Sequence, residues 1–320
     1  MKVTEHISKS KRSLFSLELL PPLKGQSISE VFEALDPLME FQIPFVDVTF
    51  HREEVDYKDV GGGLVRRSVV KRRPGTVGIC SAIQTRYKID AIPHVLCGGF
   101  TREETENFLI DLSFLEIENV MALRGDAISA ESYFTPKNGG NCHANELVRQ
   151  ISNMNNGIYL DSELKYHNPS SFCIGVASYP EKHLEAPSME SDIHFLKQKV
   201  RDGAHYVITQ MFFDNSRYFE FVERCRAQGI TIPIIPGLKP LSTLKQLNMI
   251  PHKFKIDLPD QLVREIVKAS NQQAIKEIGI EWCVQQCREL IDNNVPLIHF
   301  YSNGKTESIR RILLKLSQSF

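Results

Sequence analysis

The stretch Val120-Met121-Ala122-Leu123-Arg124-Gly125-Asp126 is an apolar run that ends abruptly in a cation, a glycine and a carboxylate. A buried strand with charged groups at its carboxyl end is how α/β enzymes build their sites, because the strand is rigid and the following loop can carry chemistry. The same arrangement recurs along the chain, where short apolar runs lead to a polar residue, a loop and a helical pattern. The stretch therefore predicts an α/β protein with its chemistry at the strand ends.

Eight apolar runs alternate with helical patterns, and we expect strands over residues 14–20, 44–50, 89–97, 120–123, 172–178, 206–210, 232–236 and 296–301. Capping boxes at 27–30 and 101–104 are expected to open two of the helices. Eight β–α units in one series predict a single (β/α)8 barrel, a TIM barrel, over residues 1–320. A doubly wound sheet is the main alternative, but the first strand ends in Glu-Leu-Leu-Pro-Pro rather than a glycine-rich dinucleotide fingerprint.

Composition excludes several classes of protein. The 38 basic and 39 acidic residues of the 320-residue chain nearly cancel, so no overall field attracts nucleic acid or anionic lipid. No stretch approaches the length of a membrane span. The seven cysteines are odd in number and form no C-x-x-C pair, so neither a disulfide framework nor a metal site is expected. We expect a reduced, cytoplasmic protein.

In a barrel, the carboxyl ends of all eight strands meet at one mouth, so residues remote in sequence converge there. Carboxylates, a histidine, cations and amides occupy these ends, without an obvious nucleophile. This set suits proton transfer and the binding of a polar heterocycle better than acyl transfer. The residues are Glu18, Thr49, His94, Arg124 with Asp126, Ser178 with Tyr179, Gln210, Lys239 and Tyr301.

Two carboxylates of this set have competing interpretations. The apolar neighbours of Glu18 would raise the pKa of its carboxyl and make it a general acid near neutrality, whereas the alternative is an edge glutamate that faces solvent. Asp126 could be a helix N-cap or the ion-pair partner of Arg124.

The segment of residues 51–75 is charged and then rich in glycine. Gly61-Gly62-Gly63 predicts a flexible loop rather than a phosphate cradle. The basic residues that follow predict a solvated helix face, and contact with a nucleotide phosphate is the alternative. They are Arg66, Arg67, Lys71, Arg72 and Arg73.

Six motifs occur in the order found in one family. They are residues 15–22 (FSLELLPP), 122–126 (ALRGD), 177–186 (ASYPEKHLEA), 208–214 (ITQMFFD), 235–237 (IPG) and 299–301 (HFY). Together they resemble the methylenetetrahydrofolate reductases, FAD-dependent enzymes that make 5-methyltetrahydrofolate, over nearly the whole chain. The resemblance implies a (β/α)8 barrel with flavin at its mouth, in agreement with the strand pattern.

The resemblance also implies roles for individual residues. Glu18 takes the place of the general acid that protonates the folate, and Asp126 that of the catalytic carboxylate beside flavin and pterin. The positions that contact FAD in the family are Thr49, His94, Arg124, Gly125, Asp126, Ala144, Tyr179, His183, Ala186, Asp192 and Lys199. The positions that bind folate are Glu18, Gln210, Gln246 and Lys305.

By the same resemblance, NAD(P)H reduces FAD and leaves, and 5,10-methylenetetrahydrofolate then takes its place in a ping-pong cycle that feeds methionine synthesis. The resemblance leaves NADH and NADPH open as donors and implies a homo-oligomer. Longer eukaryotic members of the family add a regulatory domain to the barrel; we expect no regulatory domain here, and therefore no feedback by S-adenosylmethionine. The alternative is a subunit that binds folate or flavin and depends on a partner for electrons.

Three departures from the family pattern stand out. Residues 51–75 replace a short loop that contains glycine and borders the barrel mouth. Lys305 stands where the family has an arginine that holds the glutamate tail of folate, so the bidentate geometry is lost and weaker or more permissive binding is expected. Residues 155–171 form a surface excursion before the fifth strand.

Overall fold

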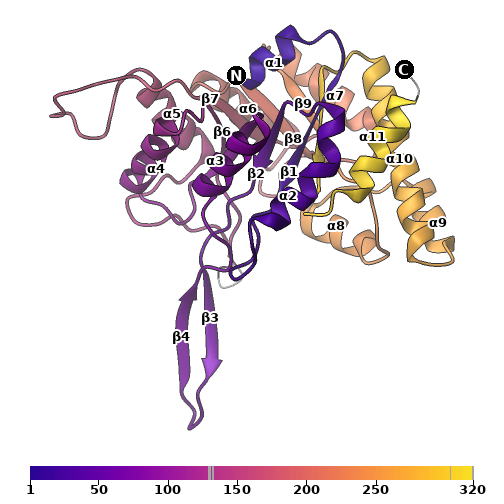
Figure 1. Ribbon diagram of the computed structural model, residues 1–320, viewed down its shortest axis with the longest axis horizontal. Helices are drawn as coiled ribbons and strands as arrows, with labels where there is room; N and C mark the ends of the chain where they lie inside the picture. Colours follow the sequence, from indigo (N-terminus) through magenta and orange to yellow (C-terminus); the bar gives the residue numbers. More distant parts are fainter. Residues whose placement is uncertain (129–130, 132, 303, 319–320) are drawn as a thin grey trace.

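Eight parallel strands close into a barrel in the computed structural model, which describes residues 1–128, 131, 133–302 and 304–318 (Figure 1). The strand β1 closes it by pairing with β2 on one side and with β10 on the other. The strands are β1 (Leu14–Leu19), β2 (Phe45–Val48), β5 (Asp90–Leu96), β6 (Asn119–Leu123), β7 (Cys173–Ser178), β8 (Tyr206–Met211), β9 (Ile234–Leu238) and β10 (Leu297–Tyr301). The predicted (β/α)8 barrel is confirmed, and each strand overlaps the run expected from the sequence.

Helices surround the barrel, and their apolar faces pack against the outward-facing residues of the strands. They are α2 (Ser29–Leu35), the 3₁₀ segment η1 (Asp36–Phe41), α3 (Thr76–Tyr87), α4 (Arg102–Phe114), α5 (Ala144–Asn155), α6 (Met189–Arg201), α7 (Asn215–Ala227), α8 (Gln246–Phe254), α9 (Asp260–Lys268), α10 (Gln272–Asp292) and α11 (Glu307–Ser317). Among the described residues, no helix is both long and apolar enough to cross a membrane.

Of the two expected capping boxes, only the second forms. Thr101 Oγ1 accepts a hydrogen bond from the backbone N–H of Glu104 at 3.0 Å, and the Glu104 carboxylate accepts one from the Thr101 N–H at 2.7 Å. The first box is wrong, because Ile28 already has helical dihedral angles and the Ser27 hydroxyl accepts only from the N–H of Ser29. The helix that follows residue 28 is α-helical only to Leu35 and continues as η1, which has a proline at its start.

Inside the barrel, apolar side chains fill the end nearest the strand starts. Tyr206 on β8 lies opposite Gly175 on β7, and a Cβ atom at residue 175 would overlap the Tyr206 ring. The glycine therefore makes room for the largest side chain in this layer. Helix α1 (Val3–Lys9), which the sequence analysis did not predict, covers the same end: Val3 is fully buried and its N–H donates to Asn119 Oδ1 at 2.9 Å.

The 51–75 segment folds into an antiparallel hairpin of β3 (Glu54–Asp59) and β4 (Val65–Val70) that extends away from the barrel (Figure 1). The expected helix face for the basic residues is therefore wrong, since Arg66 and Arg67 lie on a strand. Residues 65–70 alternate between two faces with a period of two, as in a strand. The three glycines at 61–63 all have positive φ and form the turn.

The predicted surface excursion is confirmed. Residues 156–172, between α5 and β7, contain neither helix nor strand, and Ile158 and Tyr166 are exposed. The segment is attached to α4, because the N–H of Leu160 donates to Glu106 Oε2 at 2.9 Å.

Candidate functional site

Glu18 lies near the carboxyl end of β1, opposite Asp47 of β2 and Tyr301 of β10. Because β1 is paired on both sides, Glu18 does not stand at a sheet edge. Side chains alternate between the two faces of a strand, so Glu18 and Ser16, two residues apart, lie on the same face. The Ser16 hydroxyl contacts His299 inside the barrel, and the Glu18 side chain therefore also points inward. Burial raises the pKa of the Glu18 carboxyl to about 7, and the positive charge of Lys239 opposes that rise.

Lys239 follows β9 and is only 6% exposed. Its Nζ donates to the carbonyl oxygen of Tyr301 at 3.3 Å. Burial lowers the pKa of this ammonium to about 8, while the nearby Glu18 raises it. A proton-donating carboxyl and a buried amine thus face the same mouth, and each favours the charged form of the other.

Asp47 is fully buried in the barrel, and neither carboxyl oxygen has a hydrogen-bond partner in the described part of the chain. His94 Nε2 lies 3.9 Å from Oδ1 and His299 Nδ1 lies 3.6 Å from Oδ2. Burial raises the pKa of Asp47 well above its usual range and lowers those of both histidines to about 3. Burial therefore disfavours the charged form of all three groups.

Of these three residues, only His94 was expected at the site from the sequence. A signal for Asp47 was available, because it is an acid within the apolar run of residues 44–50 and parallel barrel strands are buried on both faces.

A second group of predicted residues gathers around the loop between β7 and α6, with Tyr179, His183 and Ala186 on the loop and Asp192 and Lys199 on α6. Lys199 Nζ donates to the carbonyl of Ala177 at 2.8 Å, and burial lowers the pKa of its ammonium to about 8. Asp192 accepts from the N–H of His183 at 2.7 Å, and the His183 ring meets that of Tyr179 edge-on at 4.6 Å between centroids. Ala186 is buried and closes the loop through a hydrogen bond from its N–H to the carbonyl of His183.

Arg124, at the end of β6, faces this loop. Its guanidinium forms two hydrogen bonds with the carboxylate of Glu185, at 2.6 and 2.8 Å. The ion-pair partner of Arg124 is therefore Glu185 and not Asp126, which is exposed. Asp126 is not a helix N-cap either, because α5 begins only at Ala144. Gly125 has a φ of +86°, which allows the sharp turn after the strand.

Three of the remaining predicted residues, Thr49, Gln210 and Gln246, have local hydrogen-bond partners. Thr49 Oγ1 donates to the carbonyl of Leu19, and Gln210 Oε1 accepts from the N–H of Met211. Gln246 Oε1 accepts from the N–H groups of Ser242 and Thr243, so its amide NH2 is the group left to meet a ligand. Lys305 is exposed. Ala144 is the first residue of α5 and is partly buried.

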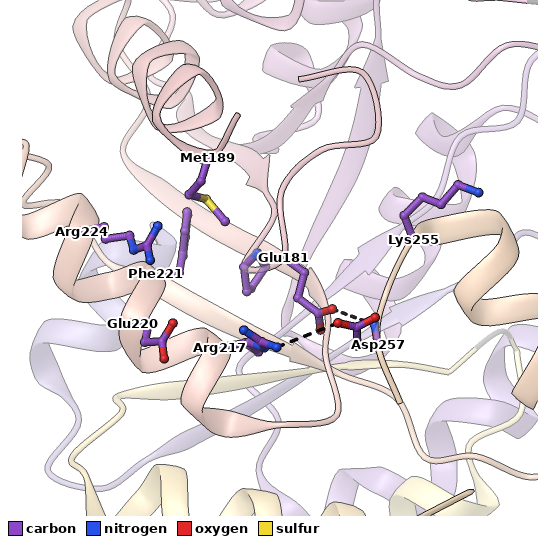
Figure 2. A pocket seen from close by; sticks show the side chains of 9 residues that line it. Glu181, Met189, Arg217, Glu220, Phe221, Arg224, Lys255 and Asp257 are labelled. Atoms are coloured by element: carbon purple, nitrogen blue, oxygen red, sulfur yellow. Dashed lines mark hydrogen bonds and ion pairs between the residues drawn. The ribbon is translucent and has the colours of Figure 1, made fainter. Parts of the chain in front are cut away.

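A cavity of about 240 Å³ lies beside the β7–α6 loop and is lined by Arg217, Arg224 and Lys255 together with three acids (Figure 2). Figure 2 shows Glu181 at its centre, where one carboxylate oxygen accepts from the N–H of Asp257 at 2.7 Å. Burial raises the pKa of Glu181 to about 6. This contact ties the β7–α6 loop to the segment that follows α8.

The donor set of the β7–α6 loop fits a flavin dinucleotide. The ammonium of Lys199 has one hydrogen bond to a described residue and keeps donors for a phosphate oxygen, and Arg124 adds a second cation. The interior groups beside it offer a proton donor and aromatic or amide surfaces to a ring system. A barrel with a carboxyl of raised pKa and two cations near one mouth has the groups that an enzyme would need to combine proton transfer with a phosphate-bearing ligand.

Comparison with known proteins defines the family. Residues 2–317 match the family model described as methylenetetrahydrofolate reductase, and the chain belongs to this family. It is 29% identical over 329 residues to methylenetetrahydrofolate reductase (NADH) 1 of Arabidopsis thaliana, covering 99% of this chain and 51% of that protein. It is 28% identical over 295 residues to 5,10-methylenetetrahydrofolate reductase of Pectobacterium carotovorum, covering 91% and 86%.

The chain spans about half the length of the eukaryotic relatives it matches. Among solved structures, an uncharacterized protein from Clostridium thermocellum, described as binding two copies of 5-methyl-5,6,7,8-tetrahydrofolic acid, has a TM-score of 0.57 at 13% identity. The likeness covers 99% of this chain and all of that one. It confirms the barrel fold.

Proposed function

We propose that the chain reduces 5,10-methylenetetrahydrofolate to 5-methyltetrahydrofolate, with FAD as cofactor and NAD(P)H as donor in a ping-pong cycle that supplies methionine synthesis. The observation that carries the proposal is Glu18, a carboxyl with a pKa near 7 inside the mouth of a barrel of this family. Relatives named for NADH and for NADPH both match at 29% identity, so the donor stays open. Seven free cysteines support a reducing, cytoplasmic setting.

In this proposal, Lys199 and Arg124 hold the pyrophosphate of FAD, while Tyr179 and His183 border the cofactor. When bound, the flavin supplies hydride transfer between nicotinamide and folate. Thr49, His94 and Gly125 would meet its ring system, and Asp126, exposed on the loop after β6, would lie beside flavin and folate.

The protein itself supplies the proton. Because its pKa lies near 7, Glu18 keeps a proton on its carboxyl at neutral pH and can deliver it to a folate nitrogen as the methylene bridge opens. Gln210 and the free NH2 of Gln246 would orient the pterin edge, and Lys305 would meet the glutamate tail as a point charge.

The test is Glu18→Gln, measured in the two half-reactions separately by anaerobic stopped-flow spectroscopy. Bleaching of flavin by NAD(P)H should stay within a few-fold of wild type, and reoxidation by methylenetetrahydrofolate should slow by at least about 100-fold, the usual contribution of a general acid. Glu163→Gln on the exposed excursion is the matched control and should change neither rate. Equal loss in both half-reactions would refute the role of Glu18, and flavin that neither nucleotide bleaches would favour a partner-dependent subunit.

A further inference from the structure

The β3–β4 hairpin has two faces of different character. Side chains alternate along each strand, and the cross-strand register pairs Val55 with Val69, Tyr57 with Arg67 and Asp59 with Val65 on one face, here called the apolar hairpin face. The opposite face is mostly polar and carries Glu54, Asp56, Lys58, Arg66 and Ser68, with Val70 at its end. There, Arg72 forms ion pairs with Glu54 at 2.8 Å and with Asp56 at 3.0 Å.

The apolar hairpin face is uncovered. Tyr57 is 62% exposed, Val65 61% and Val69 54%, and Leu64 in the turn is 67% exposed. Figure 1 shows the hairpin extending away from the helices and strands of the barrel. An isolated two-stranded hairpin is marginal in water and gains stability when an apolar face packs on something else, so this face is built to be covered.

The charges of this face indicate what covers it. It carries one acid, Asp59, and one base, Arg67, which lie on opposite strands one residue pair apart along the hairpin. Arg67 has no ion-pair partner in the residues that the structure describes. The same face carries four apolar side chains, Val55, Tyr57, Val65 and Val69. A face with one charge of each sign beside an apolar surface is complementary to itself, because a two-fold copy can offer Asp59 to Arg67 in both directions.

We propose that the apolar hairpin face binds the same face of a second copy of this chain, so that Tyr57, Val65 and Val69 of two hairpins pack together in a two-fold dimer. The balanced charge does not fit nucleic acid or anionic lipid, which require a basic surface. The proposal does not depend on the reductase activity, because the hairpin lies outside the barrel.

The test compares assembly states by sedimentation velocity over a range of concentrations. Wild type should be dimeric at micromolar concentration, and Val65→Lys should raise the dimer dissociation constant at least about tenfold by placing a charge in the apolar contact. Ser68→Lys, which adds the same charge to the polar face of the same strand, is the matched control and should leave assembly unchanged.

Exchanging the two charges distinguishes loss of the contact from unfolding of the hairpin. Arg67→Glu makes the face purely acidic and Asp59→Arg makes it purely basic, so each variant alone should be monomeric, and an equimolar mixture should form a mixed dimer. A monomeric wild type, a Val65→Lys protein that assembles like wild type, or a mixture that stays monomeric would overturn the proposal.

Discussion

Burial raises the pKa of Glu18 and lowers that of Lys239, and the charge of each residue opposes the effect of burial on the other. The ammonium limits the rise at Glu18, which would otherwise hold its proton more tightly. For a general acid this matters, because a donor whose pKa is far above the working pH gives its proton up slowly. In the proposed reaction, Lys239 is therefore a positioning and tuning residue, not a proton donor to folate.

The pH dependence of the folate half-reaction tests this assignment. The rate should fall as pH rises through about 7, because Glu18 loses the proton that it must donate. Lys239→Met removes the opposing positive charge, so the pKa of Glu18 should rise and the decline should move to higher pH. Lys268→Met, at an exposed position on α9, should leave the profile unchanged. A decline that stays in place or moves to lower pH in Lys239→Met would contradict the assignment.

Asp47 makes a prediction about stability. Its pKa in the folded protein is raised well above 3.8, its ordinary value in an unfolded chain. Below pH 3.8 the Asp47 carboxyl is protonated in both the folded and the unfolded protein, so its burial does not reduce stability. As pH rises above 3.8, the carboxyl ionises in the unfolded protein but not in the folded one, and the folded protein becomes relatively less stable. Asp47→Asn removes this loss. It should leave the free energy of unfolding nearly unchanged near pH 4 and raise it by about 1–3 kcal/mol near pH 8.

Thermal unfolding of the two proteins at both pH values measures this effect. Asp202→Asn, at a surface carboxylate that is ion-paired with Arg149, is a useful contrast, because losing that pair should not stabilise the protein at high pH. A gain for Asp47→Asn that is equal at both pH values would argue against a buried, protonated carboxyl.

Helices and strands could be predicted where one hydrophobic pattern, helical or extended, dominates a segment. The barrel strands were predictable because they are short apolar runs bounded by loops, and the helix opened by Thr101 because its capping box satisfies two N–H groups at once. The hairpin was misread because Arg66, Arg67, Lys71, Arg72 and Arg73 read as a charged helix face when charge alone is considered. The correct signal was the alternation of Val55 and Tyr57 with Asp56 and Lys58 ahead of the glycine turn.

Replacing two glycines in helices by alanine should change stability in opposite directions. Gly279 in α10 lies against the backbone of Leu241, so an added Cβ would overlap it, and Gly279→Ala should destabilise the protein by about 1–3 kcal/mol through overpacking. Gly78 in α3 is exposed with open space around its Cβ position, so Gly78→Ala should stabilise by about 0.5–1 kcal/mol through helix propensity. Chemical denaturation measures both, and the same sign for the two changes would contradict the packing of α10.

For the whole molecule, barrel closure decides which predicted residues meet. Strand order alone places Glu18, Lys239 and Tyr301 at one mouth, so this part of the site could be read from the sequence. The link between Arg124 and Glu185 could not, because it depends on how the β7–α6 loop folds back. His299 was missed because its partners, Ser16 and Asp47, come from other strands. Asp47 could have been found as an acid within an apolar run.

The match of Gly175 to Tyr206 has a consequence for how this barrel can vary among its descendants. The ring occupies the volume that a side chain at residue 175 would need, so neither position is free to drift alone. A lineage that acquires a side chain at 175 must first, or together with that change, lose bulk at 206, since the reverse order passes through an overpacked barrel. Substitutions at the two positions should therefore be inherited as a pair, and sequences that break the pairing should be rare.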